Sequence, residues 1–169
     1  MLLNRLIQKF SLIFSRIDSY QNWQIPVVLT TLTLPVIFSI SAEAQVSQAI
    51  KAKEAEGKQY VSSMNKAQQA YYSENTGFTS SIANLGLGMK SETPNYKYSI
   101  STGNKAVFNY GVSRDANLKS FVGGVFLIGT TTRTILCQTN AASTTKPANP
   151  LLNKNGTVAC GVNTTPVVQ

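Results

Sequence analysis

The most regular hydrophobic pattern of the chain lies in residues 46–74. Apolar or small residues recur there about every 3.6 positions, which is the period of an α-helix. These residues are Val46, Ile50, Gly57, Tyr60, Val61, Met64, Ala67 and Tyr71. Charged residues lie largely off this stripe, so the pattern predicts a long helix that buries one face. Asn75, Thr76 and Gly77 are expected to end it, because glycine accepts the left-handed cap conformation. Gly57 indicates either a close backbone contact or a tolerated weak point in the helix.

The hydrophobic period changes to two after Asn95, which is typical of β-strands. Four segments follow this pattern, at residues 96–100, 105–113, 120–129 and 132–139. Short, turn-rich links connect them, so consecutive strands are expected to be antiparallel neighbours. The pattern therefore predicts an α+β fold in which the long helix packs on a four-stranded antiparallel sheet. The glycine pair at 123–124 indicates a bulge or a close approach of the helix.

The first 44 residues have a different character from the rest of the chain. Apolar residues at helical spacing in residues 3–17 alternate with Arg5, Lys9 and Arg16. This pattern fits a basic amphipathic helix on an anionic membrane, or simply a positively charged leader. Residues 25–40 carry no charge, and extension to residue 44 gives a run long enough to cross a bilayer. Because basic residues precede the run, we expect the N-terminus to lie on the cytoplasmic side of the membrane.

The end of the apolar run also allows a cleaved leader. Ala42 and Ala44 have the small-x-small spacing of a signal-peptidase site, with cleavage before Gln45. The two alternatives are a membrane anchor over residues 25–44 that is retained, and a leader that is removed. Both predict that residues 45–169 form an extracytoplasmic head, either tethered to the cytoplasmic membrane or released into the periplasm or medium.

Cys137 and Cys160 are the two cysteines of the chain. In an exported protein such a pair predicts a disulfide bond, which here closes a C-terminal loop. In a reducing cytosol the alternative is two free thiols. The export signal favours the bond.

The composition of the 169-residue chain narrows the possible chemistry, because the chain contains no histidine. This absence excludes a Ser-His-Asp triad, a Cys-His pair and a His-ligated zinc site. Ser63 and Lys66 match the SxxK spacing of penicillin-binding enzymes, but the companion motifs are missing. Glu54 and Glu56 lie two positions apart on the predicted helix and do not share a face. We therefore expect a non-enzymatic protein with no cofactor and no metal site.

The positive charge is concentrated in the C-terminal part of the chain. Residues 75–169 hold eight basic and two acidic residues, and thus +6 of the net charge of +8. A basic surface for DNA, acidic polysaccharide or an anionic envelope surface is one interpretation, and scattered solubilising charge is the other. The candidate residues are Lys90, Lys97, Lys105, Arg114, Lys119, Arg133, Lys146 and Lys154. Tyr96, Tyr98 and Tyr110 are candidates for stacking on bases.

Several segments resemble a known family. They are KAKEAEGKQYVSSMNKAQQAYYSENTGF (51–78), IANLGLGMKSETPNYKYSI (82–100), LKSFVGGVF (118–126) and ILCQT followed by TTKPANP and ACG (135–161). The chain is similar over residues 50–161 to cyanobacterial type IV pilin-like proteins of the G/H family, also called general secretion pathway protein H. The resemblance implies a pilin-like fold, with a long helix on an antiparallel sheet and a C-terminal disulfide loop.

The N-terminus departs from the pattern of type IV pilins. Pilins carry a Gly before the cleavage point, then a Phe-led apolar helix with a Glu at its fifth position. Here no Gly precedes the apolar run, Trp23 takes the Phe position and Val27 replaces the Glu. The resemblance implies a minor or accessory component of a type IV pilus or of a type II secretion pseudopilus, with other pilin subunits as partners. The alternative is a free-standing periplasmic or membrane-tethered module that binds an anionic polymer and has lost fibre assembly.

Overall fold

The structure is a computed structural model that describes residues 34–168. This part of the chain comprises a unit that ends at Glu43 and a compact unit that begins at Ala44. Helix α2 (Leu34–Asn75) contributes to both units. Over residues 34–168, no helix combines the length and the apolar character needed to cross a bilayer. The predicted leader helix and residues 25–33 of the predicted anchor at 25–44 lie outside the described residues.

Helix α2 confirms the predicted helix and begins twelve residues earlier than the predicted start at residue 46. Its C-terminal end differs from the prediction, because Thr76 rather than Gly77 takes the left-handed conformation, with φ of 54°. The Thr76 amide donates to the Tyr72 carbonyl at 2.9 Å, and the Asn75 side-chain amide donates to the Tyr71 carbonyl at 3.0 Å. These bonds satisfy carbonyl groups that the last turn leaves open, which explains how the helix ends without a glycine at this position.

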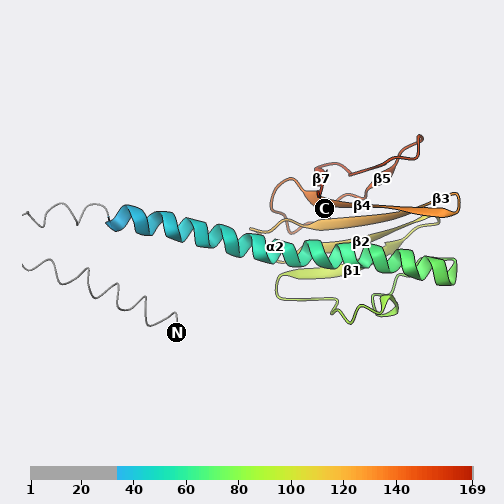
Figure 1. The fold of residues 1–169 in the computed structure, drawn as a ribbon, viewed down its shortest axis with the longest axis horizontal. Coiled ribbons are helices and arrows are strands. Elements are labelled where there is room, and N and C mark those ends of the chain that lie inside the picture. The colour runs from blue at the N-terminus through green and yellow to red at the C-terminus, as the bar shows by residue number, and fades with distance from the viewer. Residues whose placement is uncertain (1–33, 169) are drawn as a thin grey trace, which may run out of the picture. The chain divides into compact units, whose positions relative to one another are not determined.

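The four predicted strands are present as β1 (Tyr96–Thr102), β2 (Ala106–Ser113), β3 (Phe121–Ile128) and β4 (Thr131–Thr139). They form an antiparallel meander, as Figure 1 shows. The prediction of a four-stranded sheet is incomplete, because a fifth strand, β7 (Thr164–Pro166), pairs with the outer edge of β4. Three residues are too few to show a period of two, so this strand has no recognisable sequence pattern.

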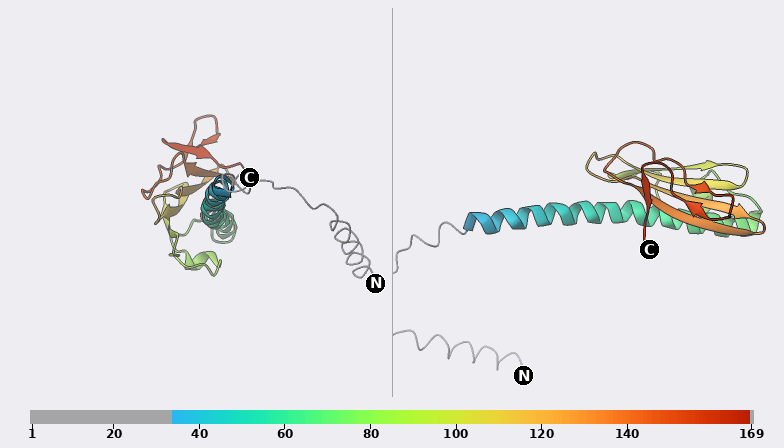
Figure 2. Two further views of the ribbon diagram at one scale, coloured as in Figure 1. Left: turned by 90° about the vertical axis from the view of Figure 1, so that its left-hand side faces the viewer. Right: turned by 90° about the horizontal axis from the view of Figure 1, so that it is seen from above.

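The central strands β2 and β3 are buried on both faces of the sheet. One face packs against α2 in a core that includes Val61, Met64, Tyr96, Tyr98 and Phe121. A second cluster contains Tyr110, Val122 and Cys137, with Phe108, Val112, Ile135 and Cys160 packed around it. The C-terminal tail covers this second face and includes a small hairpin of β5 (Leu151–Leu152) and β6 (Val158–Ala159). In the end-on view of Figure 2, the strands lie between α2 and this hairpin.

Two glycines allow the helix to lie close to the sheet. A Cβ atom on Gly57 would lie 2.7 Å from Cζ of Tyr96 and 2.9 Å from Cδ2 of Phe121. At Gly123, the space that a Cβ would occupy is filled by the side chain of Asn65. Pairing of β3 with both neighbours continues through Gly123 and Gly124 without an extra residue, so the strand has no bulge there. At Gly57 and at the glycine pair 123–124, the prediction of a close approach between helix and sheet is therefore confirmed.

Candidate functional site

A buried polar pair fixes α2 on the sheet. Asn65 is only 4% exposed, donates through Nδ2 to the Ile135 carbonyl at 3.0 Å and accepts a 2.9 Å bond from Nδ2 of Asn109. Oδ1 of Asn109 is buried and has no partner within the described residues. Buried amides stabilise one arrangement when paired and are costly when unpaired, so this contact specifies where the helix lies.

Two carboxylates of α2 bind the segments that precede β1 and β3. Glu56 accepts bonds from Oγ1 of Thr93 at 2.6 Å, Nδ2 of Asn95 at 2.7 Å and the hydroxyl of Tyr98 at 3.3 Å. Glu54 instead accepts the backbone amide of Lys119 at 3.0 Å. Burial, reinforced by the negative charge of Glu56, raises the pKa of the Tyr98 phenol far above its usual value. The two carboxylates therefore hold separate loops against the helix.

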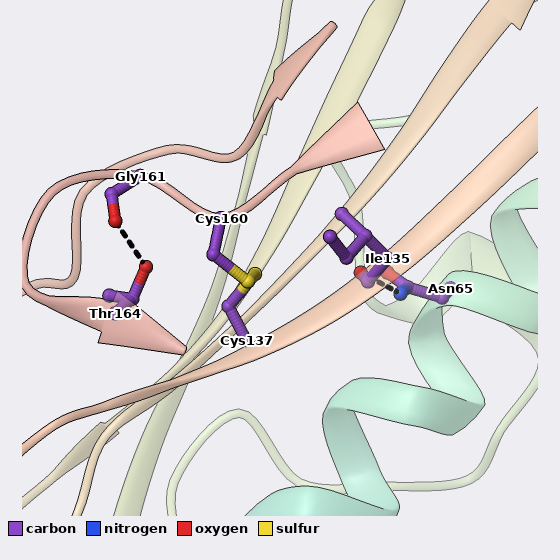
Figure 3. The surroundings of a disulfide bond; sticks show 6 residues. All are labelled: Asn65, Ile135, Cys137, Cys160, Gly161 and Thr164. Carbon is purple, nitrogen blue, oxygen red and sulfur yellow. Dashed lines mark hydrogen bonds between the residues drawn. A yellow bond between two sulfur atoms is a disulfide. The ribbon is translucent and has the colours of Figure 1, made fainter. Parts of the chain in front are cut away.

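The predicted disulfide bond is present between Cys137 and Cys160, whose Cα atoms are 5.8 Å apart. The described chain accordingly has no free cysteine. Figure 3 shows that the bond lies on the side of β4 opposite to α2, from which Asn65 reaches the carbonyl of Ile135. The strand is thus held by the helix on one face and by the tail on the other.

Residues 146–150 clip the tail onto the second face of the sheet. Nζ of Lys146 lies 3.9 Å from the ring centre of Tyr110, and the hydroxyl of Tyr110 donates to Oδ1 of Asn149. Pro147 and Pro150 are buried, and Pro150 lies where the absence of a side chain on Gly124 makes room for it. The clip is therefore a fixed part of the head and presents Lys146 on a rigid aromatic support.

An open groove of about 570 Å³ lies between residues 139–148 and residues 162–164. The Asn140 amide donates to the Asn163 carbonyl at 3.1 Å and joins the two walls. Ser143 is tied to the sheet by its own amide, which donates to the Leu118 carbonyl at 2.9 Å, and by its carbonyl, which accepts the Ser120 hydroxyl at 2.6 Å. The groove is lined mainly by small, hydroxyl and amide side chains, and Lys146 is its charged lining residue.

The structure distributes the predicted basic residues over different parts of the head. Lys105 precedes β2 and Arg114 follows it, so these two residues, at the opposite ends of the strand, are about 30 Å apart. Arg133 pairs with Phe126 near the Lys105 end, whereas Lys97 pairs with Val112 near the Arg114 end.

Of the remaining members, Lys119 lies at the same end of the sheet as Lys97 and Arg114, and Lys90 and Lys154 lie in loops. Arg114 forms a 3.0 Å ion pair with Glu92 and donates to the Thr93 carbonyl. Lys119 lies two residues before β3 at the Arg114 end, Lys90 is exposed in the loop before β1, and Lys154 is exposed in the β5–β6 turn. The six residues Lys90, Lys97, Lys105, Arg114, Lys119 and Arg133 are thus not gathered into one cluster.

The tyrosines proposed for base stacking are unavailable for that role. Tyr96, Tyr98 and Tyr110 are 0%, 2% and 1% exposed. Their alternation with polar residues marks buried strand positions, so the stacking interpretation is wrong.

The remaining sequence candidates lie on α2. Ser63 is half-buried and Lys66 is exposed on the helix surface. Ala42, Ala44 and Gln45 all lie within α2, and Ala44 and Gln45 are exposed. In residues 34–168, no group of three or more His, Cys, Asp or Glu side chains is arranged to hold a metal ion.

Sequence reasoning missed the groove because its walls come from segments about twenty residues apart. The one local signal for the groove in the sequence is the position of the cysteines. One wall begins at Thr139, two residues after Cys137, and the other begins at Val162, two residues after Cys160.

Comparison with known proteins agrees with this architecture. The model of a protein family described as type IV pilin-like G and H matches residues 54–161, from the middle of α2 to the residue after Cys160. No curated protein and no solved structure matches the chain.

Proposed function

The chain belongs to the type IV pilin-like G and H family, and we propose that it is a non-enzymatic subunit of the cell envelope. In this proposal it is a minor or accessory component of a type IV pilus or of a type II secretion pseudopilus. The observation that carries the proposal is the family match over residues 54–161, which include the C-terminal half of α2, strands β1 to β4 and both cysteines of the disulfide. Partners are then other pilin or pseudopilin subunits.

In the same proposal, residues 1–44 direct the chain to the membrane and residues 45–169 form the extracytoplasmic head. The uncharged run at 25–40 and the basic residues before it support an anchor with its N-terminus inside. The disulfide bond supports a head that folds in an oxidising compartment.

Sheared-filament preparations test the assembly role. Immunoblots with an antibody to the head should detect the chain in sheared pili or pseudopili, and its deletion should reduce piliation or secretion. Absence from the filaments, together with normal piliation and normal secretion in the deletion strain, would contradict the proposal.

N-terminal sequencing of the mature protein tests the leader. A start at Met1 indicates a tethered protein, a start at Gln45 a released head, and a start near Trp23 processing by prepilin peptidase. Ala44→Leu removes the small residue that a signal peptidase requires and should abolish a start at Gln45. Ala52→Leu, at an exposed position of the same helix, is the matched control and should leave processing unchanged.

A second candidate function is a module that binds an anionic polymer, such as DNA or an acidic polysaccharide, without assembling into a fibre. The specific observation in its favour is that no Asp or Glu follows Asp115, whereas Lys119, Arg133, Lys146 and Lys154 do. The absence of the Gly and Glu of the pilin signature also favours it. Binding of the full chain to either polymer should weaken as salt rises, and binding that is equal at low and high salt would remove this candidate.

A further inference from the structure

We infer that the groove between residues 139–148 and 162–164 is a binding site for an acidic polysaccharide, with Lys146 pairing with a carboxylate of the sugar chain. This inference rests on the second candidate function and names its ligand class and its site. The volume of about 570 Å³ lies within the usual range of ligand sites, roughly 300–1,000 Å³.

The charge around the groove selects an anion. Its walls come entirely from the part of the chain that lacks Asp and Glu. Within the described residues Lys146 forms no ion pair, in contrast to Arg114 and Lys53. The ammonium group contacts the electron-rich face of Tyr110, and this contact holds it in place while leaving its positive charge uncompensated. A ligand carboxylate can therefore bind Lys146 without displacing a carboxylate of the protein.

The groove is organised before any ligand arrives. The disulfide bond joins the chain two residues before each wall, and the Asn140–Asn163 bond joins the walls themselves. Oγ of Ser143 and Oγ1 of Thr145 are hydrogen-bonded at 2.7 Å, so two wall hydroxyls have fixed positions. Fixed walls reduce the ordering cost of binding, which favours recognition by many weak polar contacts.

The lining favours a polysaccharide over a nucleic acid. A nucleic acid carries a charge on every phosphate, and proteins bind single strands with several basic groups and exposed aromatic rings. This groove offers one ammonium group among hydroxyl and amide groups, and Tyr110 beside it is only 1% exposed. Uronic-acid chains match that composition, because each of their carboxylates is accompanied by several hydroxyl groups and by no aromatic base.

Calorimetric titration of the purified full chain in detergent provides the test. The probes are an oligogalacturonate, its fully methyl-esterified form, and a single-stranded DNA of the same charge. We expect the oligogalacturonate to bind, and both the neutral ester and the DNA to bind at least about tenfold more weakly, which is the effect of losing one charge-assisted contact. Equal affinity for the ester or for the DNA would overturn the inference.

Two matched variants locate the site. Lys146→Gln should weaken oligogalacturonate binding about tenfold. Lys105→Gln removes the same charge from an exposed position just before β2 and should change the binding less than about twofold. Thermal unfolding verifies that both variants remain folded. Binding that responds equally to both variants overturns the groove but leaves the second candidate function standing. Failure of the full chain to bind any of the anionic probes overturns both.

Discussion

Substitution of Gly57 by alanine separates local helix preference from tertiary packing. Gly57 lies inside α2, where alanine is intrinsically favoured over glycine by about 1 kcal/mol. A prediction from helix propensity alone is therefore that Gly57→Ala stabilises the protein. The packing of the helix against the sheet predicts the opposite.

The magnitude follows from the contacts of the added methyl group. It would lie 2.7 and 2.8 Å from two atoms of the Tyr96 ring and 2.9 Å from the Phe121 ring. Both rings are essentially fully buried, and the Tyr96 hydroxyl donates to the Lys119 carbonyl at 3.0 Å, so neither ring has room to move. Overpacking of this kind costs about 1–3 kcal/mol, and a clash on two sides belongs at the upper end. After the propensity gain is subtracted, we expect a net loss of about 1–2 kcal/mol.

Urea denaturation of the full chain, followed by circular dichroism, measures the free energy of unfolding. Ala55→Gly at an exposed position of the same helix is the matched control and should lose about 1 kcal/mol through propensity alone. The melting temperature of Gly57→Ala should fall by roughly 2–4 °C for each kcal/mol lost. An increase in stability for Gly57→Ala, mirroring the loss in Ala55→Gly, would refute the close-packing argument.

Three further predictions concern the polar core, the disulfide and the buried phenols. Asn65→Ala leaves the amide of Asn109 without its partner and should cost about 2–3 kcal/mol in the free energy of unfolding, measured in urea. Joint replacement of Cys137 and Cys160 by serine opens the loop between them and should cost about 3 kcal/mol by the same assay. The pKa of Tyr98 is raised in the fold, so the unfolded state loses its proton first and stability should fall as the pH rises above about 10, the usual pKa of a phenol. Tyr98→Phe should make that fall less steep.

Each of these results has a contrary outcome. An Asn65→Ala protein as stable as the parent would mean that the amide pair does not hold the helix. If the parent chain showed the same stability with and without reductant, the tail would be held by its packing and not by the covalent bond. If the stability of Tyr98→Phe fell above pH 10 as steeply as that of the parent, groups other than Tyr98 would be responsible for the fall.

The helix and the four main strands could be predicted because their signals are local. The 3.6-residue stripe of α2 and the alternation in β1 to β4 each result from one element burying one face, and both can be read from neighbouring residues. The disulfide was also predictable, since two cysteines in an exported chain leave one pairing. In contrast, the same alternation led to a wrong interpretation of Tyr96, Tyr98 and Tyr110. A two-residue period shows which side chains of one strand share a face of the sheet, but it does not show which face of the sheet is covered by other elements.

The end of α2 and the polar pair show a second kind of limit. Gly77 was the expected cap, yet Thr76 takes the left-handed conformation because side-chain and backbone bonds near the terminus compensate it. Asn65 lies next to the buried Met64 and was not expected in the core. Its role depends on the missing side chain of Gly123, which is 58 positions away in the sequence.

By itself, the sequence determined the elements, their order and the covalent closure of the tail, because each depends on local periodicity or on a single possible pairing. Only the tertiary structure decided that the tail covers the second face of the sheet, that it adds β7 to the sheet, and that its two ends form a groove beside Lys146. The physical reason is that these features arise from contacts between segments distant in the chain, whose short polar sequences carry no period. The concentration of charge after residue 74 was visible in the sequence, but its division between separate parts of the head became apparent only when the strands were placed side by side.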